Sequence, residues 1–117
     1  MRLALRAMLA VLASAAVAPA FAQEHAGDNA AGRAVYTRWC APCHAPGVSH
    51  PGTNALTVKY KGVKSGVLLE WNDLPAATLK FVVRHGISVM PQFRKTEISD
   101  EELDALANFL ARNTPVK

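Results

Sequence analysis

Two thiols and an imidazole lie within one short segment of the chain. Residues 40–44 have the sequence Cys-Ala-Pro-Cys-His, and Cys40 and Cys43 are the only two cysteines in the sequence. A Cys-x-x-Cys-His segment is typical of covalent c-type haem attachment, because two cysteines at this spacing can reach the two vinyl groups on one edge of a porphyrin. The adjacent His44 is then placed to bind the iron. The segment therefore predicts one covalently bound haem c, held by Cys40, Cys43 and His44.

The same segment leaves a second chemistry open. With Trp39 in front, the sequence Trp-Cys-Ala-Pro-Cys also resembles the redox-active turn of thioredoxin-like proteins, in which a lowered cysteine pKa drives disulfide exchange. That fold places a hydrophobic strand before the motif. Residues 27–38 are instead polar and alanine-rich, with Val35 as their only β-branched aliphatic residue, and they predict a helix. Haem attachment is the favoured interpretation, and thiol exchange by Cys40 and Cys43 is the alternative.

The first 22 residues have the features of a secretory signal peptide. Arg2 and Arg6 supply positive charge, residues 7–17 are apolar, and residues 20–22 form an Ala-x-Ala cleavage site. The apolar run is short for a membrane span, so cleavage is favoured over an uncleaved anchor. We expect a periplasmic protein, because bacteria attach haem to this motif on the outer side of the inner membrane. The expected domains are a signal peptide at 1–22 and one monohaem domain at 23–117.

Charge and hydropathy exclude two classes of partner. The sequence holds 13 Lys and Arg against 9 Asp and Glu, and removal of Arg2 and Arg6 leaves 11 against 9, a formal charge of +2. Such a small excess is not the footprint of a nucleic-acid-binding protein. No later run is long and apolar enough for a membrane helix. We therefore expect no nucleic acid partner and no membrane span in the mature chain.

Apolar spacing and breaker residues predict an all-α domain of three to four helices with long loops. Helices are expected over residues 29–39, 53–60 and 75–85, and a closing helix is expected after Ser99. For the third helix, Asn72 or Asp73 is the expected cap, Pro75 belongs to the first turn and Gly86 ends the helix. Residues 99–102, Ser-Asp-Glu-Glu, form a capping box, and the stripe behind it contains Leu103, Leu106, Ala107 and Leu110.

Gly32, Tyr36 and the haem motif together carry a family resemblance. The pattern Gly-x-x-x-Tyr-x-x-x-Cys-x-x-Cys-His over residues 32–44 resembles the N-terminal helix and haem motif of class I (mitochondrial-type) c cytochromes. The resemblance extends, with a variable middle, over nearly all of residues 23–117. It implies the small cytochrome c fold, with Phe109 of the closing helix packed near Gly32. It also implies a proline carbonyl, that of Pro51, as acceptor for the ring N–H of the axial histidine.

Met90 is the only methionine of residues 23–117, since the other two lie in the expected signal peptide. Residues 86–91, Gly-Ile-Ser-Val-Met-Pro, are similar to the loop that delivers the sixth iron ligand in class I cytochromes. The resemblance therefore implies His44 and Met90 as the two axial ligands. An iron with two histidine ligands, using His50 or His85 in place of Met90, is the alternative.

His/Met ligation leaves no open position on the iron, which suits one-electron transfer. The sequence offers no catalytic dyad, phosphate loop or second metal site, so we expect an electron carrier and not an enzyme. A haem-based sensor or catalytic cytochrome with a labile sixth ligand is one alternative, and the thiol oxidoreductase is the other.

Residues 90–93, Met-Pro-Gln-Phe, are similar to cytochrome subunits of flavoprotein dehydrogenases such as p-cresol methylhydroxylase. This similarity implies a flavoprotein dehydrogenase as electron donor and a downstream cytochrome or oxidase as acceptor, with a freely diffusing carrier as the alternative. Lys59, Lys61 and Lys64 form a basic cluster that could steer an acidic redox partner.

Overall fold

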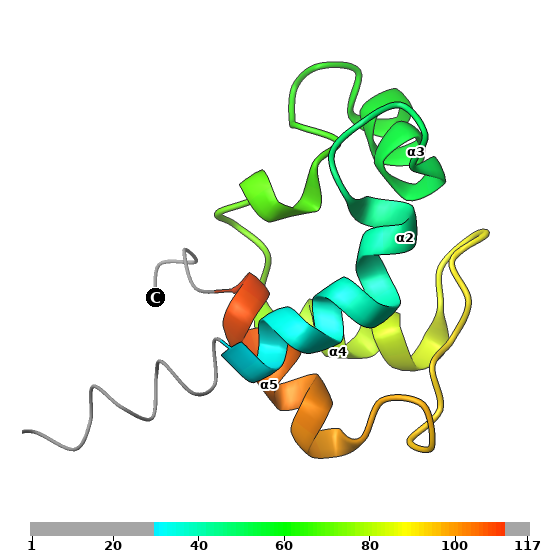
Figure 1. Ribbon diagram of the computed structural model, residues 1–117. Helices are drawn as coiled ribbons and strands as arrows, with labels where there is room; N and C mark the ends of the chain where they lie inside the picture. Colours follow the sequence, from blue (N-terminus) through cyan, green and yellow to red (C-terminus); the bar gives the residue numbers. More distant parts are fainter. Residues whose placement is uncertain (1–29, 112–117) are drawn as a thin grey trace, which may run out of the picture.

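The computed structural model describes residues 30–111, which form a set of helices joined by long loops (Figure 1). Within this range the only β pairing is an isolated bridge between Ile87 and Met90, so the predicted all-α class is confirmed. The expected signal peptide at 1–22 lies outside the described residues. The elements are η1 (Tyr36–Cys40), α2 (Ala41–His44), α3 (Pro51–Tyr60), η2 (Leu68–Glu70), α4 (Ala76–His85) and α5 (Asp100–Leu110).

The predicted helix before the haem motif is present and runs directly into it. Residues 30–35 are α-helical, the π-helical turn η1 follows, and α2 continues from it without a break. A single π turn inside an α-helix is uncommon and is frequent at functional sites. Here it ends at Cys40, so the irregular turn carries the first thiol of the motif.

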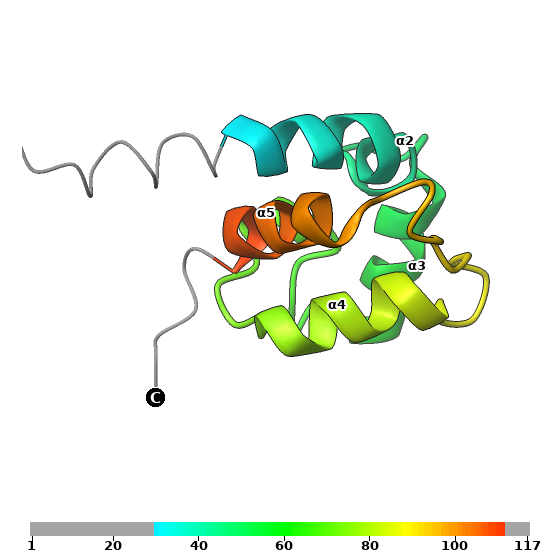
Figure 2. The ribbon, with the colours of Figure 1, turned by 90° about the horizontal axis from the view of Figure 1, so that it is seen from below.

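The N-terminal helix packs directly against α5, as Figure 2 shows, and Gly32 lies at the contact. A Cβ atom at Gly32 would lie 2.1 Å from the Ala105 carbonyl oxygen and 2.5 Å from Cβ of Phe109. Phe109 is only 2% exposed, and its ring centroid lies 6.0 Å from that of Tyr36. The expected packing of Phe109 near Gly32 is therefore confirmed, and the missing side chain of Gly32 permits it.

The capping box predicted for α5 is formed in full. Ser99 Oγ accepts a hydrogen bond from the Glu102 backbone N–H at 3.1 Å, and the Glu102 carboxylate accepts one from the Ser99 N–H at 2.8 Å. The apolar side of α5 faces the N-terminal helix and α4. All four residues of the predicted stripe are buried, namely Leu103, Leu106, Ala107 and Leu110.

Two other helix starts differ from the prediction. Pro75 is the N-cap of α4 and not part of its first turn, and neither Asn72 nor Asp73 caps the helix. Pro75 has extended backbone angles (φ −66°, ψ 136°), and these end the loop without any side-chain bond. The α3 helix begins at Pro51, two residues before the prediction, because proline is tolerated in a first turn. Gly86 caps the end of α4 as predicted, with φ +71°.

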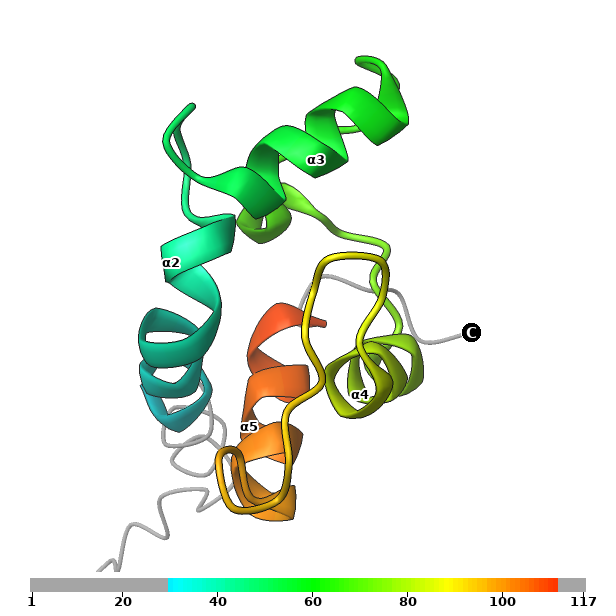
Figure 3. The same ribbon diagram turned by 90° about the vertical axis from the view of Figure 1, so that its right-hand side faces the viewer.

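The remaining architecture gathers the haem motif and the loop after α4 at one end of the molecule. Figure 3 shows α2, α3 and this loop standing around that end, while α4 and α5 pack side by side below them. No helix within residues 30–111 has the length and apolar character needed to cross a bilayer.

Candidate haem-binding site

The two cysteines of the motif are free thiols in different surroundings. Cys40 is buried, with 8% of its surface exposed, and Cys43 is exposed. Burial, with a smaller contribution from the charge of Cys43, raises the pKa of the Cys40 thiol to about 11. A thiol exchange site needs a lowered cysteine pKa and a strand before the motif, whereas here a helix precedes it. Neither condition is met at Cys40, which disfavours the thioredoxin-like alternative.

His44 ends α2, and its imidazole lies against the first turn of α3. A Cβ atom at Gly52 would meet His44 Cε1 at 2.7 Å and Nδ1 at 2.8 Å, so the ring occupies the space that a side chain at this position would fill. Nδ1 is buried and has no hydrogen-bond partner among the residues that the structure describes. Burial lowers the pKa of His44, which favours the neutral imidazole that binds metal ions.

The expected acceptor for His44 Nδ1, the carbonyl of Pro51, does not make this bond. Pro51 is the first residue of α3. The carbonyl of a first-turn residue points along the helix axis toward the N–H four residues later. The sequence-based expectation was wrong because the helix starts at Pro51 itself, whereas the prediction had left that residue in a loop.

Met90 closes a tight turn directly after α4. The Ile87 N–H donates to the Met90 carbonyl at 3.1 Å, and the Met90 N–H donates to the Ile87 carbonyl at 2.9 Å. Ser88, inside the turn, has φ +53°, a backbone conformation that residues with a side chain seldom adopt. A Cβ atom at Gly86 would lie 2.6 Å from the Met90 carbonyl oxygen. Gly86 thus ends α4 and also leaves room for the backbone of Met90, whose side chain is half-buried against the core.

Phe93 links the Met90 turn to the haem motif. Its ring packs edge-on against Trp39, with the centroids 5.8 Å apart and the planes at 71°. Trp39 directly precedes Cys40, so this contact ties a loop some fifty positions later in the sequence to the residue beside the first thiol. The Phe93 N–H donates to the Val83 carbonyl of α4 at 2.8 Å, which fixes the other side of the loop.

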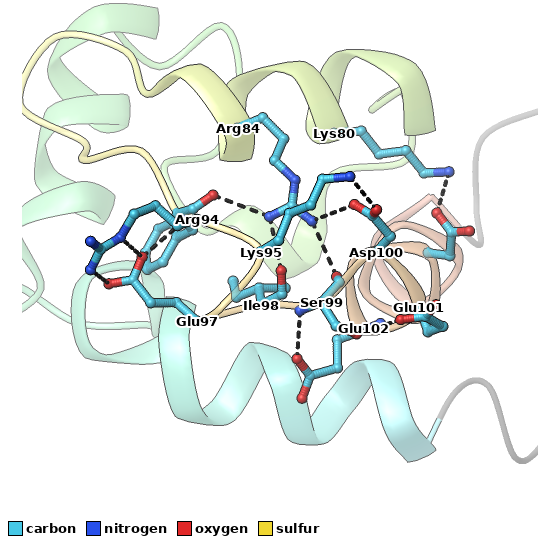
Figure 4. Close-up of polar contacts among 12 residues, drawn as sticks. Lys80, Arg84, Arg94, Lys95, Glu97, Ile98, Ser99, Asp100, Glu101 and Glu102 are labelled. Carbon is cyan, nitrogen blue, oxygen red and sulfur yellow. Dashed lines mark hydrogen bonds and ion pairs between the residues drawn. The ribbon is translucent and has the colours of Figure 1, made fainter.

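Arg84 organises the second half of the same loop, a role that the sequence did not reveal (Figure 4). Its guanidinium donates to the carbonyl oxygens of Phe93 (3.1 Å), Ile98 (2.9 Å) and Ser99 (3.2 Å), and to Asp100 Oδ1 (2.9 Å). The planar fork of arginine can serve several acceptors at once. From the sequence, an arginine in the last turn of a helix predicts only a favourable interaction with the helix dipole.

The other two described histidines are engaged by backbone carbonyls. His50 Nδ1 lies 3.0 Å from the Pro42 carbonyl oxygen. His85 Nδ1 lies 2.8 Å from the Phe81 carbonyl oxygen, and its ring stacks on the exposed Phe81 ring at 4.2 Å. His25 lies outside the described residues.

The three lysines of the expected basic cluster differ in their contacts. Lys64 Nζ lies over the Trp71 ring, 3.6 Å from its centroid, and pairs with Asp73. Lys59 and Lys61 are exposed. Lys59 Nζ likewise lies over the Tyr60 ring, 5.5 Å from its centroid, so the steering of an acidic partner by these lysines stays a prediction.

Comparison with known proteins identifies the family. The family described as cytochrome c oxidase, cbb3-type, subunit III matches residues 27–110. The chain belongs to this family of c-type cytochromes. It is also 33% identical over 101 residues to the cytochrome c subunit of 4-cresol dehydrogenase (hydroxylating) from Pseudomonas putida, a match that covers 86% of this chain and 72% of the relative. No solved structure matches the chain.

These matches confirm both resemblances stated for the sequence, to c-type cytochromes and to a dehydrogenase cytochrome subunit. A c-type cytochrome binds haem c and transfers electrons, so both properties follow for this chain. The residues fit such a group, because Cys40 and Cys43 are free thiols and the neighbouring His44 is a half-buried imidazole whose buried Nδ1 has no partner among the described residues. The loop that carries Met90 is tied to the same segment through the Trp39–Phe93 contact.

Proposed function

We propose that this cytochrome carries a single haem, bound covalently to Cys40 and Cys43, with His44 and Met90 as axial ligands. When bound, the haem supplies an iron that cycles between Fe(II) and Fe(III) by one electron. The observation that carries the proposal is the Trp39–Phe93 contact, because it brings the Met90 loop to the haem motif across a long stretch of sequence.

Other residues of the chain fix the positions of the proposed axial ligands. Gly52 makes room for the His44 imidazole, and burial keeps that ring neutral. Gly86 and Arg84 hold the loop that carries Met90, from its two ends. A weak thioether ligand benefits from such a fixed backbone, since a preorganised ligand loses less conformational entropy on binding.

A held Met90 favours an electron carrier over the alternative of a sensor or catalytic cytochrome with a labile sixth ligand. Two permanent axial ligands leave no position for an exogenous molecule, and Met/His ligation raises the reduction potential. Addition of carbon monoxide to the reduced protein at neutral pH tests this choice. An unchanged spectrum is expected, and rapid formation of a carbon monoxide complex would favour the sensor or catalytic alternative.

The proposed electron donor is a dehydrogenase subunit, and the acceptor is a downstream cytochrome or oxidase. The name of the Pseudomonas putida relative, a cytochrome c subunit of 4-cresol dehydrogenase, supports the donor. Beside Met90 the chain presents Val89, 90% exposed, and Ile87, 51% exposed, which suit contact with a protein partner. We further propose a periplasmic location for residues 23–117, supported by the signal-peptide features of residues 1–22.

Covalent attachment is tested by expression with the haem-attachment machinery, followed by a denaturing gel stained for haem. The wild-type chain should retain one haem, and Cys40→Ala with Cys43→Ala should retain none. Haem loss from the wild-type chain under these conditions would contradict the proposal. Co-purification with a dehydrogenase encoded by a neighbouring gene would show that the protein is a dehydrogenase subunit. Purification without such a partner would favour a freely diffusing carrier.

A further inference from the structure

The short helix α2 ends with carbonyl groups that no continuing helix can satisfy. It spans only Ala41–His44, and Ala45 leaves it with extended backbone angles (φ −68°, ψ 159°). The next residue, Pro46, has no N–H and disfavours a helical conformation for Ala45. The carbonyls at the end of a helix then need partners from elsewhere in the chain.

Side chains from three places in the chain supply these partners. The Tyr36 hydroxyl donates to the His44 carbonyl at 2.9 Å, and the Thr53 hydroxyl donates to the Ala45 carbonyl at 2.8 Å. His50 Nδ1 lies 3.0 Å from the Pro42 carbonyl oxygen. Tyr36 and Thr53 are 4% and 5% exposed, so water has little access to replace either residue.

We propose that Tyr36 and Thr53 are positioning residues that set the orientation of the His44 imidazole. Tyr36 reaches the His44 backbone from the N-terminal side of the motif, and Thr53 reaches the next peptide from α3. Because both peptides are fixed, the imidazole can change its direction only by rotation about its own side-chain bonds. The ring packs against Gly52 on one side, which restricts these rotations. This inference rests on the proposed role of His44 as an iron ligand and adds what determines the direction of that ligand.

The two hydroxyls can be removed with almost no change in shape. Tyr36→Phe and Thr53→Val delete one donor each and keep the packed volume. Tyr60→Phe and Thr57→Val are matched controls, because Tyr60 packs edge-on against Trp71 and the Thr57 hydroxyl donates to a carbonyl within α3. Neither control residue donates to the carbonyls of α2.

Electron paramagnetic resonance of the ferric holoprotein and the proton shifts of its haem methyl groups report ligand orientation. Both depend on the plane of the axial imidazole, whereas a change in overall stability moves neither. We expect Tyr36→Phe and Thr53→Val to shift the largest g value and to redistribute the methyl shifts beyond the differences shown by the two controls. Thr53→Ser keeps the hydroxyl that Thr53→Val lacks, so its g values and methyl shifts should equal those of the wild type.

Unchanged g values and methyl shifts, together with lowered denaturation midpoints, would overturn the proposal, because the hydroxyls would then be structural caps only. If Tyr36→Phe fails to retain haem, Thr53→Val and Thr53→Ser decide. Loss of haem from Tyr36→Phe and Thr53→Val with normal controls would also overturn it, since the site would then collapse without the ligand being reoriented. A wild-type protein without a low-spin ferric signal would contradict the proposed function itself, whatever the variants show.

Discussion

Gly86 and Gly62 share a positive φ, at +71° and +82°, but only one of them has a close neighbour. A Cβ atom at Gly86 would strike the Met90 carbonyl oxygen, whereas at Gly62 it would meet nothing within 4 Å. An alanine at either position carries backbone strain of about 1–3 kcal/mol. Only Gly86→Ala should in addition displace the Met90 backbone.

The comparison of Gly86→Ala with Gly62→Ala therefore distinguishes the effect of backbone strain, which both variants share, from displacement of Met90, which only Gly86→Ala should cause. Both variants should have a lower free energy of unfolding. Gly86→Ala alone should weaken the sulfur-to-iron absorption band of the ferric protein. Equal bands in the two variants would show that the Met90 turn tolerates the added methyl group.

At this scale the sequence alone suggests the proposed haem ligands, whereas it does not reveal the contacts that support them. Cys40, Cys43 and His44 belong to one five-residue motif, and Met90 is the only methionine of residues 23–117 and precedes a proline. The contacts of Gly52 and Arg84 depend on where separate segments meet in space, and no local pattern encodes that. The proline carbonyl was wrongly predicted for the same reason, because it required the exact start of α3.

Among the elements, the crossing of the N-terminal helix and α5 depends on one missing side chain. Alanine normally stabilises a helix interior by about 1 kcal/mol relative to glycine. At Gly32 the added Cβ would overlap the Ala105 carbonyl and Phe109, so Gly32→Ala should instead destabilise the protein by about 1–3 kcal/mol. Chemical denaturation gives the sign of the effect.

The exposed Ala34 on the same helix provides the control for this prediction. Ala34→Gly should cost about 1 kcal/mol through helix propensity alone. A Gly32→Ala variant more stable than the wild type would refute the close crossing.

Arg84 joins α4, the loop after it and the start of α5 through four hydrogen bonds. Arg84→Met keeps the aliphatic stem and removes all four donors, and it should lower the free energy of unfolding by about 2–4 kcal/mol. The matched control is Lys80→Met, one turn earlier on α4, which breaks only the exposed pair with Asp104. Because the loop carries Met90, thermal loss of the sulfur-to-iron band should come earlier in Arg84→Met alone. Coincident band loss in the two variants would contradict this coupling.

The same cluster gives stability a pH dependence. Hydrogen bonds from Lys95 and then from Arg84 lower the pKa of Asp100. A carboxylate whose pKa is lower in the folded state stabilises the protein fully above its ordinary pKa of about 3.9. That stabilisation is lost as the pH falls through the lowered value.

The difference in unfolding free energy between the wild type and Asp100→Asn measures this contribution. It should be constant near neutral pH and should shrink as the pH falls below about 4. Denaturation curves recorded across this range provide the check. A difference that does not change with pH would show that Asp100 is not coupled to its cationic neighbours.

The helices themselves were well predicted, because local signals mark most of them. The Ser99 capping box, the Gly86 stop and the apolar stripe of α5 each lie within one or two turns of sequence. The π turn over Tyr36–Cys40 and the extended N-cap at Pro75 carry no such signal.

The whole molecule is a small domain whose apolar surface is incompletely covered by its own helices. Val48, Val63 and Val89 are each about nine-tenths exposed. Domains of this size are marginally stable when they rely on a protein core alone. The proposed covalent haem would add a large apolar body to such a core, and the proposed axial bonds of His44 and Met90 would join α2 to the loop after α4.

The absorption spectrum of the ferric holoprotein, compared between the wild type and Met90→Ala, tests the central claim most directly. The wild type should show a c-type spectrum in alkaline pyridine and a weak long-wavelength sulfur-to-iron band at neutral pH. Met90→Ala should retain the covalent haem and lose that band. A wild-type protein with covalent haem but no such band, or a band that survives in Met90→Ala, would contradict His44 and Met90 as the axial pair.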